Sequence, residues 1–235
     1  MNSKNYFILG KNITKNITMM NQWFFFRGKK YVLRFYMPHK PTKWGFKIHS
    51  MVDSKSNFLY DIIFDAGKEW KKIINPETDK SCSRAIVNTL VDKLPKTGNH
   101  LFFDSWYSSI ELLTDLNEKG YFYTTTLKPN NKNFPDKNKI EKSSIRKYVY
   151  NNTNNLLIQQ YNDKKTIYFA TNYEDTTSKI RNIYYFENRG VDKLNQYISY
   201  NSLDRKVNKW WKKLFFWGIE VSSIKFTYFM ETFKR

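Results

Sequence analysis

The spacing of hydrophobic positions in the first part of the chain predicts two β-hairpins. Apolar runs at 23–26 and 31–37 flank a Gly28-Lys29 turn, and runs at 45–52 and 58–65 flank a longer polar turn. We therefore expect the chain to open with antiparallel sheet.

Helical spacing replaces alternation after residue 80. A helix is expected to begin at Ser81 and to end at Pro95, because apolar residues recur there at steps of three and four. Its inward residues are Ile86, Val87, Leu90, Val91 and Leu94. The apolar run 101–103 then predicts a buried strand.

A second helix is expected to start at Ser108 or Ser109 and to stop at Gly120, with Ile110, Leu112, Leu113 and Leu116 inward. A strand at 121–127 should follow it. Strands first, then strands alternating with helices, indicate a mixed α/β core.

The second half is less regular. Residues 128–147 are polar and interrupted by prolines, which predicts a loop or the start of an insertion. Short β-like runs follow at 156–160 and 166–171, and 183–186 is a further strand candidate. Helical territory is expected from Asp192.

A last helix is predicted from apolar residues at helical steps, with lysines off that line. The apolar residues are Trp210, Leu214, Trp217, Val221, Ile224 and Tyr228. We interpret this pattern as a helix with one face on the core and a solvated basic side.

The chain is strongly basic, with 40 Lys and Arg residues against 21 Asp and Glu and a formal net charge of +19. A positive field of this size attracts polyanions, which makes DNA an expected partner. Lys, Asn, Tyr, Phe and Ile are all abundant together, and the codons of an AT-rich genome would give the same composition. Both interpretations of the charge stay open at this point.

Cysteine and histidine are too sparse for the common zinc sites. Cys82 is the only cysteine, which rules out a disulfide scaffold and favours an intracellular compartment. His39, His49 and His100 match no zinc-ligand spacing. The sequence has no evident secretory signal or membrane span, so we expect a nuclear or cytoplasmic protein that is not secreted and has no membrane partner.

Two carboxylates stand at predicted strand-to-helix boundaries. Asp104 follows the apolar strand at 101–103, and Asp192 opens the late helical stretch. The first acidic residue in the chain is only Asp53, so the earliest strands supply no carboxylate. Because a strand-terminal Asp is also a common helix cap, its position alone does not establish chemistry.

Five sequence segments together closely resemble the transposase domain of the piggyBac family. They are RFYMPHKPTKWGFK at 34–47, VDSK at 52–55, AGK at 66–68, FDSWYSS at 103–109 and GVDKLNQ at 190–196. In that family a basic Pro-Lys-Pro turn, a Lys-x-Gly-x-Lys strand and an Asp-Asn-Trp-Phe-Thr-Ser block occur in this order and at about this spacing. The resemblance spans most of residues 20–220.

The resemblance implies an RNase H-like α/β fold, in which a mixed sheet is flanked by helices and a small β-rich insertion precedes the late helices. We expect residues 20–130 and 180–235 to form the core, 131–179 the insertion and 1–19 an N-terminal tail. Family members are cut-and-paste DNA transposases that act at TTAA sites. Their carboxylates hold Mg²⁺, for which Mn²⁺ can substitute, and two such ions stabilise the attacking and leaving oxygens of a phosphodiester.

By this resemblance, Asp104 corresponds to the second catalytic, metal-binding aspartate and Asp192 to the third. A further family aspartate aligns with Asn195, which keeps a ligand oxygen without the charge. Residues 26–29 match the family's Phe-Arg-Gly-Arg block, and counting back from them places Met20 at the first catalytic aspartate. Met20 offers a thioether, which Mg²⁺ does not favour.

The missing carboxylate favours a catalytically impaired remnant or domesticated fragment that binds DNA. Its expected DNA contacts are Arg34, Lys40, Lys43 and Lys47, and Asp53 is expected to be a turn residue rather than a substitute ligand. We expect neither the family's upstream DNA-binding region nor its cysteine-rich zinc module, and a homodimer is a candidate assembly. An active metal-dependent transposase, and a basic protein with no nucleic-acid role, stay as alternatives.

Overall fold

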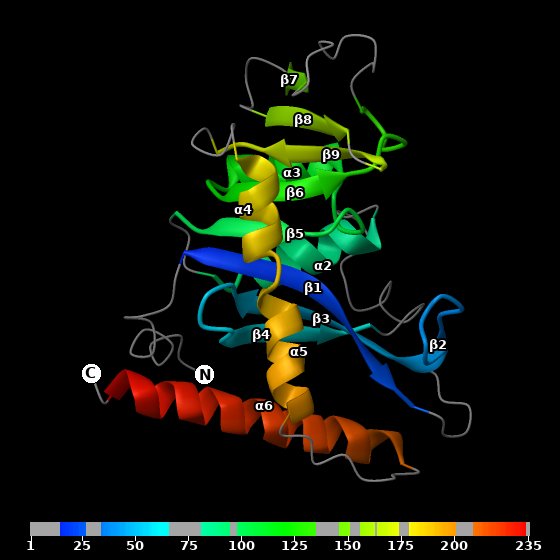
Figure 1. Cartoon of the computed structure of the whole chain (residues 1–235), viewed down its shortest axis with the longest axis vertical. Helices are drawn as coiled ribbons and strands as arrows, with labels where there is room; N and C mark the ends of the chain where they lie inside the picture. The colour runs from blue at the N-terminus through cyan, green and yellow to red at the C-terminus, as the bar shows by residue number, and fades with distance from the viewer. Residues whose placement is uncertain are drawn as a thin grey trace.

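The computed structural model describes residues 15–26, 34–65, 81–94, 98–134, 146–150, 156–162, 164–173, 179–200 and 209–233. These residues form one mixed sheet with helices on both of its faces (Figure 1). The α/β class expected from the sequence is therefore confirmed.

Within the described ranges, nine strands make up the sheet. They are β1 (Asn16–Phe25), β2 (Phe35–Tyr36), β3 (Trp44–Asp53), β4 (Leu59–Phe64), β5 (His100–Phe103), β6 (Phe122–Leu127), β7 (Arg146–Tyr150), β8 (Leu156–Asn162) and β9 (Thr166–Thr171). The strand order is β2-β3-β1-β5-β6-β9-β8-β7, and β4 also pairs with β3. The β1–β5 and β5–β6 pairs are parallel, and the other pairs are antiparallel. The segment β4-β3-β1-β5-β6 has the order of an RNase H-like core.

The described helices are α2 (Cys82–Val91), α3 (Ile110–Glu118), α4 (Ile180–Glu187), α5 (Gly190–Tyr200) and α6 (Trp210–Phe233). In Figure 1, α4 and α5 run down the front of the sheet, and α2 and α3 lie behind it. The rear helices pack on the inward residues of β1 and β5, such as Met19 and Phe103. The front helices α5 and α6 bury Ile48 and Val52 of β3. The fold is thus three layers with a separate apolar core on each face.

Both rear helices begin where the sequence predicts. Ser109 is the N-cap of α3, and its Oγ accepts a hydrogen bond from the Leu112 backbone N–H at 3.2 Å. Gly120 follows α3 with φ of 77°, a left-handed conformation that glycine adopts without strain. Ser81 precedes α2, although its hydroxyl shares a hydrogen bond with Ser83 instead of a backbone N–H.

The first predicted hairpin is wrong, whereas the second is confirmed. Trp23 lies opposite Lys47 and Phe25 opposite Gly45, so β1 pairs with β3 and not with the described part of 31–37. Gly45 allows this pairing, because a Cβ there would lie 2.2 Å from the Phe24 carbonyl oxygen. The expected 45–52 and 58–65 hairpin appears as β3 and β4.

The strand expected at 183–186 is also wrong, because these residues belong to α4. Ile180 and Tyr184, four residues apart, are the buried residues of this helix, and they pack on Phe102 and Phe169. The short apolar run has no alternation, and such a run fits either a helix or a strand until its neighbours are placed.

The strands expected at 156–160 and 166–171 are confirmed as β8 and β9. Antiparallel pairing of β9 with β6 joins them to the main sheet, so they continue the core sheet at its far edge. At the other end of the chain, β1 begins at Asn16, within the stretch expected to be an N-terminal tail. The division into core, insertion and tail otherwise stays a prediction.

The last helix has the core face that the sequence predicts, but its outer side differs. Trp217 and Val221 of α6 are buried, and Leu214 and Ile224 pack beside them, whereas the side chain of Tyr228 lies outside the described residues. Lys209 and Lys212 are exposed, as expected for a basic side, but large apolar residues such as Phe215 and Phe226 are exposed beside them. Within the described parts of the chain, no helix is both long and apolar enough to span a membrane.

Candidate metal and nucleic-acid site

The register of the two central parallel strands places Met20 beside Asp104. Met19 pairs with Phe103 at the end of the β1–β5 ladder. Met20 follows Met19, and Asp104 follows Phe103. Successive side chains of a strand point to opposite faces. Met19 is part of the core behind the sheet, whereas Met20 packs with the front core under α5.

Asp104 is exposed at the start of the turn between β5 and α3. Its Oδ1 accepts a hydrogen bond from the Ser105 backbone N–H at 2.6 Å, and its carbonyl accepts one from Tyr107 N–H at 3.0 Å. Burial, followed by the charge of Asp104, raises the pKa of Tyr107. The pKa of Tyr184 on α4 is likewise raised by burial and, to a smaller extent, by Asp104. The charge of Asp104 thus acts on Tyr107, in the core behind the sheet, and on Tyr184 of α4, in front of it.

Gly190 fixes the start of α5 against the sheet and so positions Asp192. A Cβ at position 190 would lie 3.1 Å from Ser54 Cα and 3.3 Å from Thr18 Oγ1. Thr18 Oγ1 donates a hydrogen bond to the Glu187 carbonyl at 2.7 Å, and it lies 2.8 Å from Ser54 Oγ. The α4–α5 junction is therefore tied to β1, two residues before Met20.

Asp192 lies in the first turn of α5, exposed and close to two cations. Partial burial of the carboxyl group raises the pKa of Asp192, whereas the charges of Lys40 and Arg189 lower it. Lys40 comes from the turn before β3, far away in the sequence. The charge of Lys40, a predicted DNA contact, therefore acts on the carboxyl of Asp192, a predicted metal ligand.

Asn195 is half-buried on α5, one helical turn after Asp192. Residues three apart share a helix face, so the two side chains flank the same side of α5. Their neighbours Val191 and Leu194 are buried in the core that Met20 contacts. Because α5 contacts β1 and β3, Asp192 and Asn195 lie on the front side of the sheet, the side to which Met20 points.

The donors present do not fit a two-metal site. In the part of the chain that the structure describes, no group of three or more His, Cys, Asp or Glu side chains could hold a metal ion. Asp104 and Asp192 supply oxygen ligands, but Met20 supplies only sulfur, and Mg²⁺ prefers oxygen. Lys40 near Asp192 adds positive charge where a cation would need negative charge. No catalytic step through a metal follows from these residues.

Asp53 does not replace the missing carboxylate. It is buried at the end of β3, and its Oδ1 accepts hydrogen bonds from the Ser56 N–H at 2.6 Å and the Lys55 N–H at 3.1 Å. The Ser56 hydroxyl donates a third at 2.7 Å. This Asx-type turn is the structural role expected from the sequence.

Unpartnered polar groups surround Met20, and the sequence did not reveal them. Ser50 lies opposite Met20 in the β1–β3 register, and Gln22 is two residues further along the same face of β1. Both side chains are buried, and neither the Ser50 hydroxyl nor the two amide atoms of Gln22 have a hydrogen-bond partner among the described residues. Position 20 is thus an apolar side chain in a partly polar setting.

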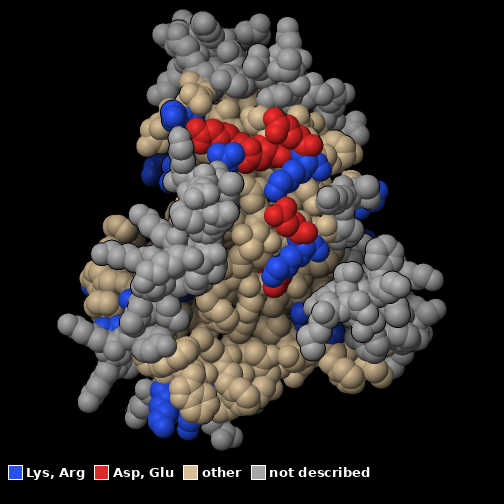
Figure 2. All heavy atoms as spheres, turned by 180° about the vertical axis from the view of Figure 1, so that it is seen from behind, with Lys and Arg blue, Asp and Glu red and all other residues tan. Residues whose placement is uncertain are grey.

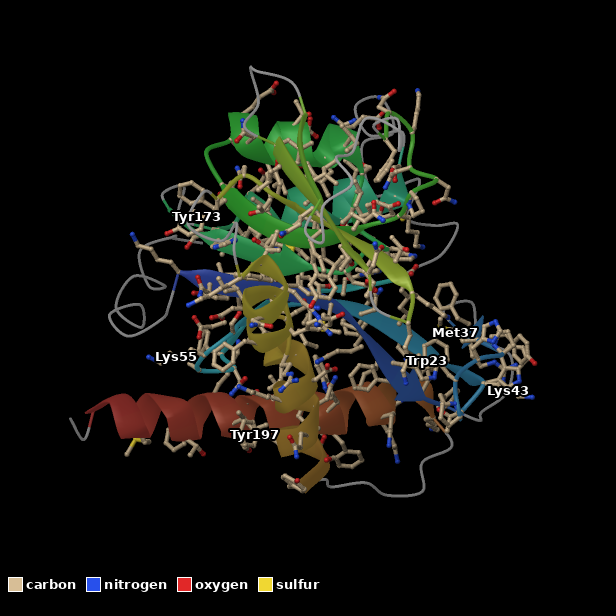
Figure 3. The ribbon with its side chains drawn as sticks, turned by 45° about the horizontal axis from the view of Figure 1, so that its top comes forward. Trp23, Met37, Lys43, Lys55, Tyr173 and Tyr197 are labelled. Atoms are coloured by element: carbon tan, nitrogen blue, oxygen red, sulfur yellow. The ribbon has the colours of Figure 1, made fainter. Side chains whose placement is uncertain are left out.

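The turn between β2 and β3 presents two of the expected DNA contacts, Lys40 and Lys43. Met37 N–H donates to the Lys43 carbonyl at 2.7 Å, which closes the turn, and Trp23 Nε1 donates to the Thr42 carbonyl at 2.9 Å, which ties the turn to β1. Figure 3 shows Trp23, Met37 and Lys43 together at this end of the sheet. Lys40 and Lys43 are both exposed, so this turn can meet a phosphate backbone.

The other two expected DNA contacts lie against aromatic rings. The Arg34 guanidinium is 4.2 Å from the centre of the Trp44 ring. Lys47 Nζ is 3.5 Å from the centre of the Trp106 ring and 3.4 Å from Asp65 Oδ2. Burial lowers the pKa of Lys47, and the Asp65 charge opposes that effect. Lys47 is therefore held inside a side-chain cluster behind the sheet, away from Lys40 and Lys43.

An RNase H-like sheet with one aspartate after β5 and another in the first turn of a late helix is compatible with the transposase class. A family model described as Transposase IS4 matches residues 2–224, and the chain belongs to this family.

The fold is similar to that of piggyBac transposase. The matching structure is a cryo-EM structure of the piggyBac transposase synaptic complex with hairpin DNA, with a TM-score of 0.80 and 23% sequence identity. The match covers 94% of this chain and 48% of the piggyBac chain, so this chain spans about half the length of that relative. The RNase H-like fold implied by the sequence motifs is confirmed by this match.

Proposed function

We propose that this chain is a transposase-derived domain that binds DNA and cannot assemble the two-metal site of its family. One observation carries the proposal: the β1–β5 register supports Met20 as the residue beside Asp104, where a shared carboxylate would be needed. Under this proposal Asp104, Asp192 and Asn195 are remnants of the ligand set for Mg²⁺ or Mn²⁺. A nuclear or cytoplasmic location is part of the same proposal.

The distribution of charge supports DNA contact at the β2–β3 turn. The rear face, over α2 and α3, mixes acidic and basic side chains in Figure 2. Ion pairs join Arg84 to Asp115 and Lys119 to Asp92 there, so much of that charge is neutralised. Lys40 and Lys43 form the exposed basic turn, and Lys40 reaches the electrostatic field of Asp192. The piggyBac relative with this fold is itself a complex with hairpin DNA.

We expect duplex DNA to bind with an affinity that falls steeply as salt increases, because bound phosphates release counterions. The double substitution Lys40→Ala with Lys43→Ala should lower the slope of log affinity against log salt by about 2, since each phosphate that a lysine neutralises contributes roughly 0.9 to that slope. Fluorescence anisotropy with a labelled duplex at several salt concentrations measures this slope.

A matched control removes two lysines from the rear face. Lys93 and Lys119 pair with Asp61 and Asp92, so Lys93→Ala with Lys119→Ala changes the net charge equally but should leave the slope nearly unchanged. If the two double variants changed the slope equally, DNA affinity would depend on the net charge of the chain and not on the β2–β3 turn. Absence of binding, or an affinity that does not respond to salt, would favour a basic protein with no nucleic-acid role.

A further inference from the structure

The outward side of α4 carries two aromatic rings that the core does not use. Tyr185 is 40% exposed and Phe186 is 67% exposed, which makes Phe186 one of the most exposed large apolar side chains of the described residues. Adjacent exposed rings on a surface mark an interaction site more often than single ones do. We therefore looked at what lies beside these two rings.

The opposite side of α4 fixes the helix on the sheet. Ile180 and Tyr184 are buried with Phe169 of β9, and α4 crosses the front of β9 in Figure 1. The Phe169 ring also meets the edge of the Tyr185 ring at 6.2 Å between ring centres. At 100° per residue, positions 185 and 186 point away from the buried positions 180 and 184. The exposed rings therefore stand on a well-supported helix.

Cationic side chains lie at both ends of this ring pair. The Arg181 guanidinium carbon is 4.4 Å from the centre of the Tyr161 ring of β8 and 5.9 Å from the centre of the Tyr185 ring. Arg181 also donates a hydrogen bond to the Tyr161 hydroxyl at 2.9 Å. On α5, Lys193 Nζ is 5.6 Å from the centre of the Phe186 ring. These five side chains form an aromatic row that runs from β8 across α4 to α5.

Alternating rings and cations match the chemistry of unpaired nucleobases. A base stacks on an aromatic ring or on the plane of a guanidinium group, and a nearby cation contacts the phosphate. In a duplex the bases are already stacked on one another, so a duplex offers no base face to the row. Charge alone is a weak attraction here, because Asp192 directly precedes Lys193. Stacking should therefore supply most of the affinity.

We propose that the aromatic row binds single-stranded nucleic acid by stacking unpaired bases on Tyr185 and Phe186. Tyr161 and Arg181 extend the stacking surface towards β8. The row shares no residue with the basic β2–β3 turn, so this site goes beyond the duplex contact proposed above and does not depend on it. Single-stranded DNA and RNA offer the same stacking chemistry, and the experiment compares the two.

The test is the affinity of the full chain for three labelled strands of equal length, measured by fluorescence anisotropy. The strands are an oligothymidylate, an oligouridylate and an abasic DNA strand, which keeps the phosphates but has no bases. The unaltered chain should bind at least one of the two strands with bases more tightly than the abasic strand. Phe186→Leu keeps an apolar side chain but removes the ring, and it should weaken that binding by about 5-fold or more. Its affinity for the abasic strand should not change.

Two further variants control for the ring and for the position. Phe186→Trp retains a ring and should keep the affinity of the unaltered chain. Phe215→Leu removes an equally exposed class of side chain from α6, where Phe215 is 58% exposed and lies outside the row, and it should have no effect. Circular dichroism of each variant confirms that it is folded.

Three results would overturn the proposal. They are equal affinity of the unaltered chain for the abasic strand and both strands with bases, unchanged binding by folded Phe186→Leu, and an equal loss in Phe215→Leu. If the proposal holds, the strand that is bound more tightly shows whether the partner is DNA or RNA. The salt dependence of duplex binding tests the β2–β3 turn separately, so failure of one site is distinguishable from failure of the other.

Discussion

Met20→Asp is expected to raise the affinity of the chain for Mn²⁺ by about tenfold or more, a gain of about 1.4 kcal/mol in binding free energy. Met20 lies beside Asp104 in the strand register and packs with the same core as Val191 of α5. An aspartate there adds an oxygen ligand to the carboxylates of Asp104 and Asp192. Isothermal titration calorimetry of both chains with Mn²⁺ measures the difference.

The same substitution should lower the stability of the metal-free chain by about 1–3 kcal/mol, because it places a carboxylate in a partly buried setting beside the apolar front core. The Ser50 hydroxyl, opposite position 20 and without a partner among the described residues, limits this cost by offering a donor. Excess Mn²⁺ should restore stability, since a ligand that binds only the folded state stabilises it.

Two variants control for the charge and the position. Met20→Asn provides a similar shape without the charge and should not gain Mn²⁺ affinity. Met20→Asp combined with Asp104→Ala should abolish the improvement, because it again leaves two carboxylates. Equal Mn²⁺ affinity in Met20→Asp and the unaltered chain would mean that residue 20 is not at the metal position.

Gly45→Ala is expected to destabilise the fold by about 3 kcal/mol or more, one of the largest effects available to a single methyl group. The added Cβ would lie 2.2 Å from the Phe24 carbonyl oxygen and 2.9 Å from Trp23 Cε2. Both neighbours belong to β1, so the strand that carries Met20 would have to move away from β3. Urea denaturation measures the change in the free energy of unfolding.

Gly218→Ala is the matched control for this substitution. Gly218 lies within α6, and a Cβ there would meet no atom within 4 Å outside its own helix. Because alanine favours helices over glycine, we expect a gain of about 0.5–1 kcal/mol. If both variants were destabilised by similar amounts, the close approach of β1 and β3 at Gly45 would not explain the effect.

Local signals identified most of the individual elements. The Ser109 cap, the helical spacing before residue 95 and the apolar run ending at Phe103 depend on neighbouring residues, and all three predict the observed elements. Strand pairing depends on distant residues, so the hairpin of 23–26 with 31–37 was predicted wrongly. The decisive feature was Gly45, whose missing side chain lets β3 approach β1.

The sequence motifs gave candidate ligands, which stay a prediction, but they gave no information on the surroundings of these residues. Motif spacing pointed to Asp104, Asp192 and Met20, because these positions follow recognisable blocks of sequence. The proximity of Lys40 to Asp192, and the burial of Lys47 against Trp106, follow from tertiary packing that no local pattern reports.

The outward apolar residues of α6, such as Phe215, are present in the sequence, but the apolar residues on the core-facing side of the same helix obscured them. The residues that face the core recur at the same helical steps as those that face outward, and one face was sufficient to explain the helix. Only the exposed positions in the fold separate the two sets, as Phe215 and Trp217 demonstrate.

Plasmid nicking by the unaltered chain is the most direct measurement of whether the site still works. Supercoiled DNA is incubated with the unaltered chain and with Asp104→Ala, in Mg²⁺ and in Mn²⁺, and the relaxed product is quantified on a gel. Because two carboxylates are too few to hold a pair of metal ions close together, both proteins should give the same background. Metal-dependent nicking by the unaltered chain that Asp104→Ala abolishes would contradict the loss of the site through Met20.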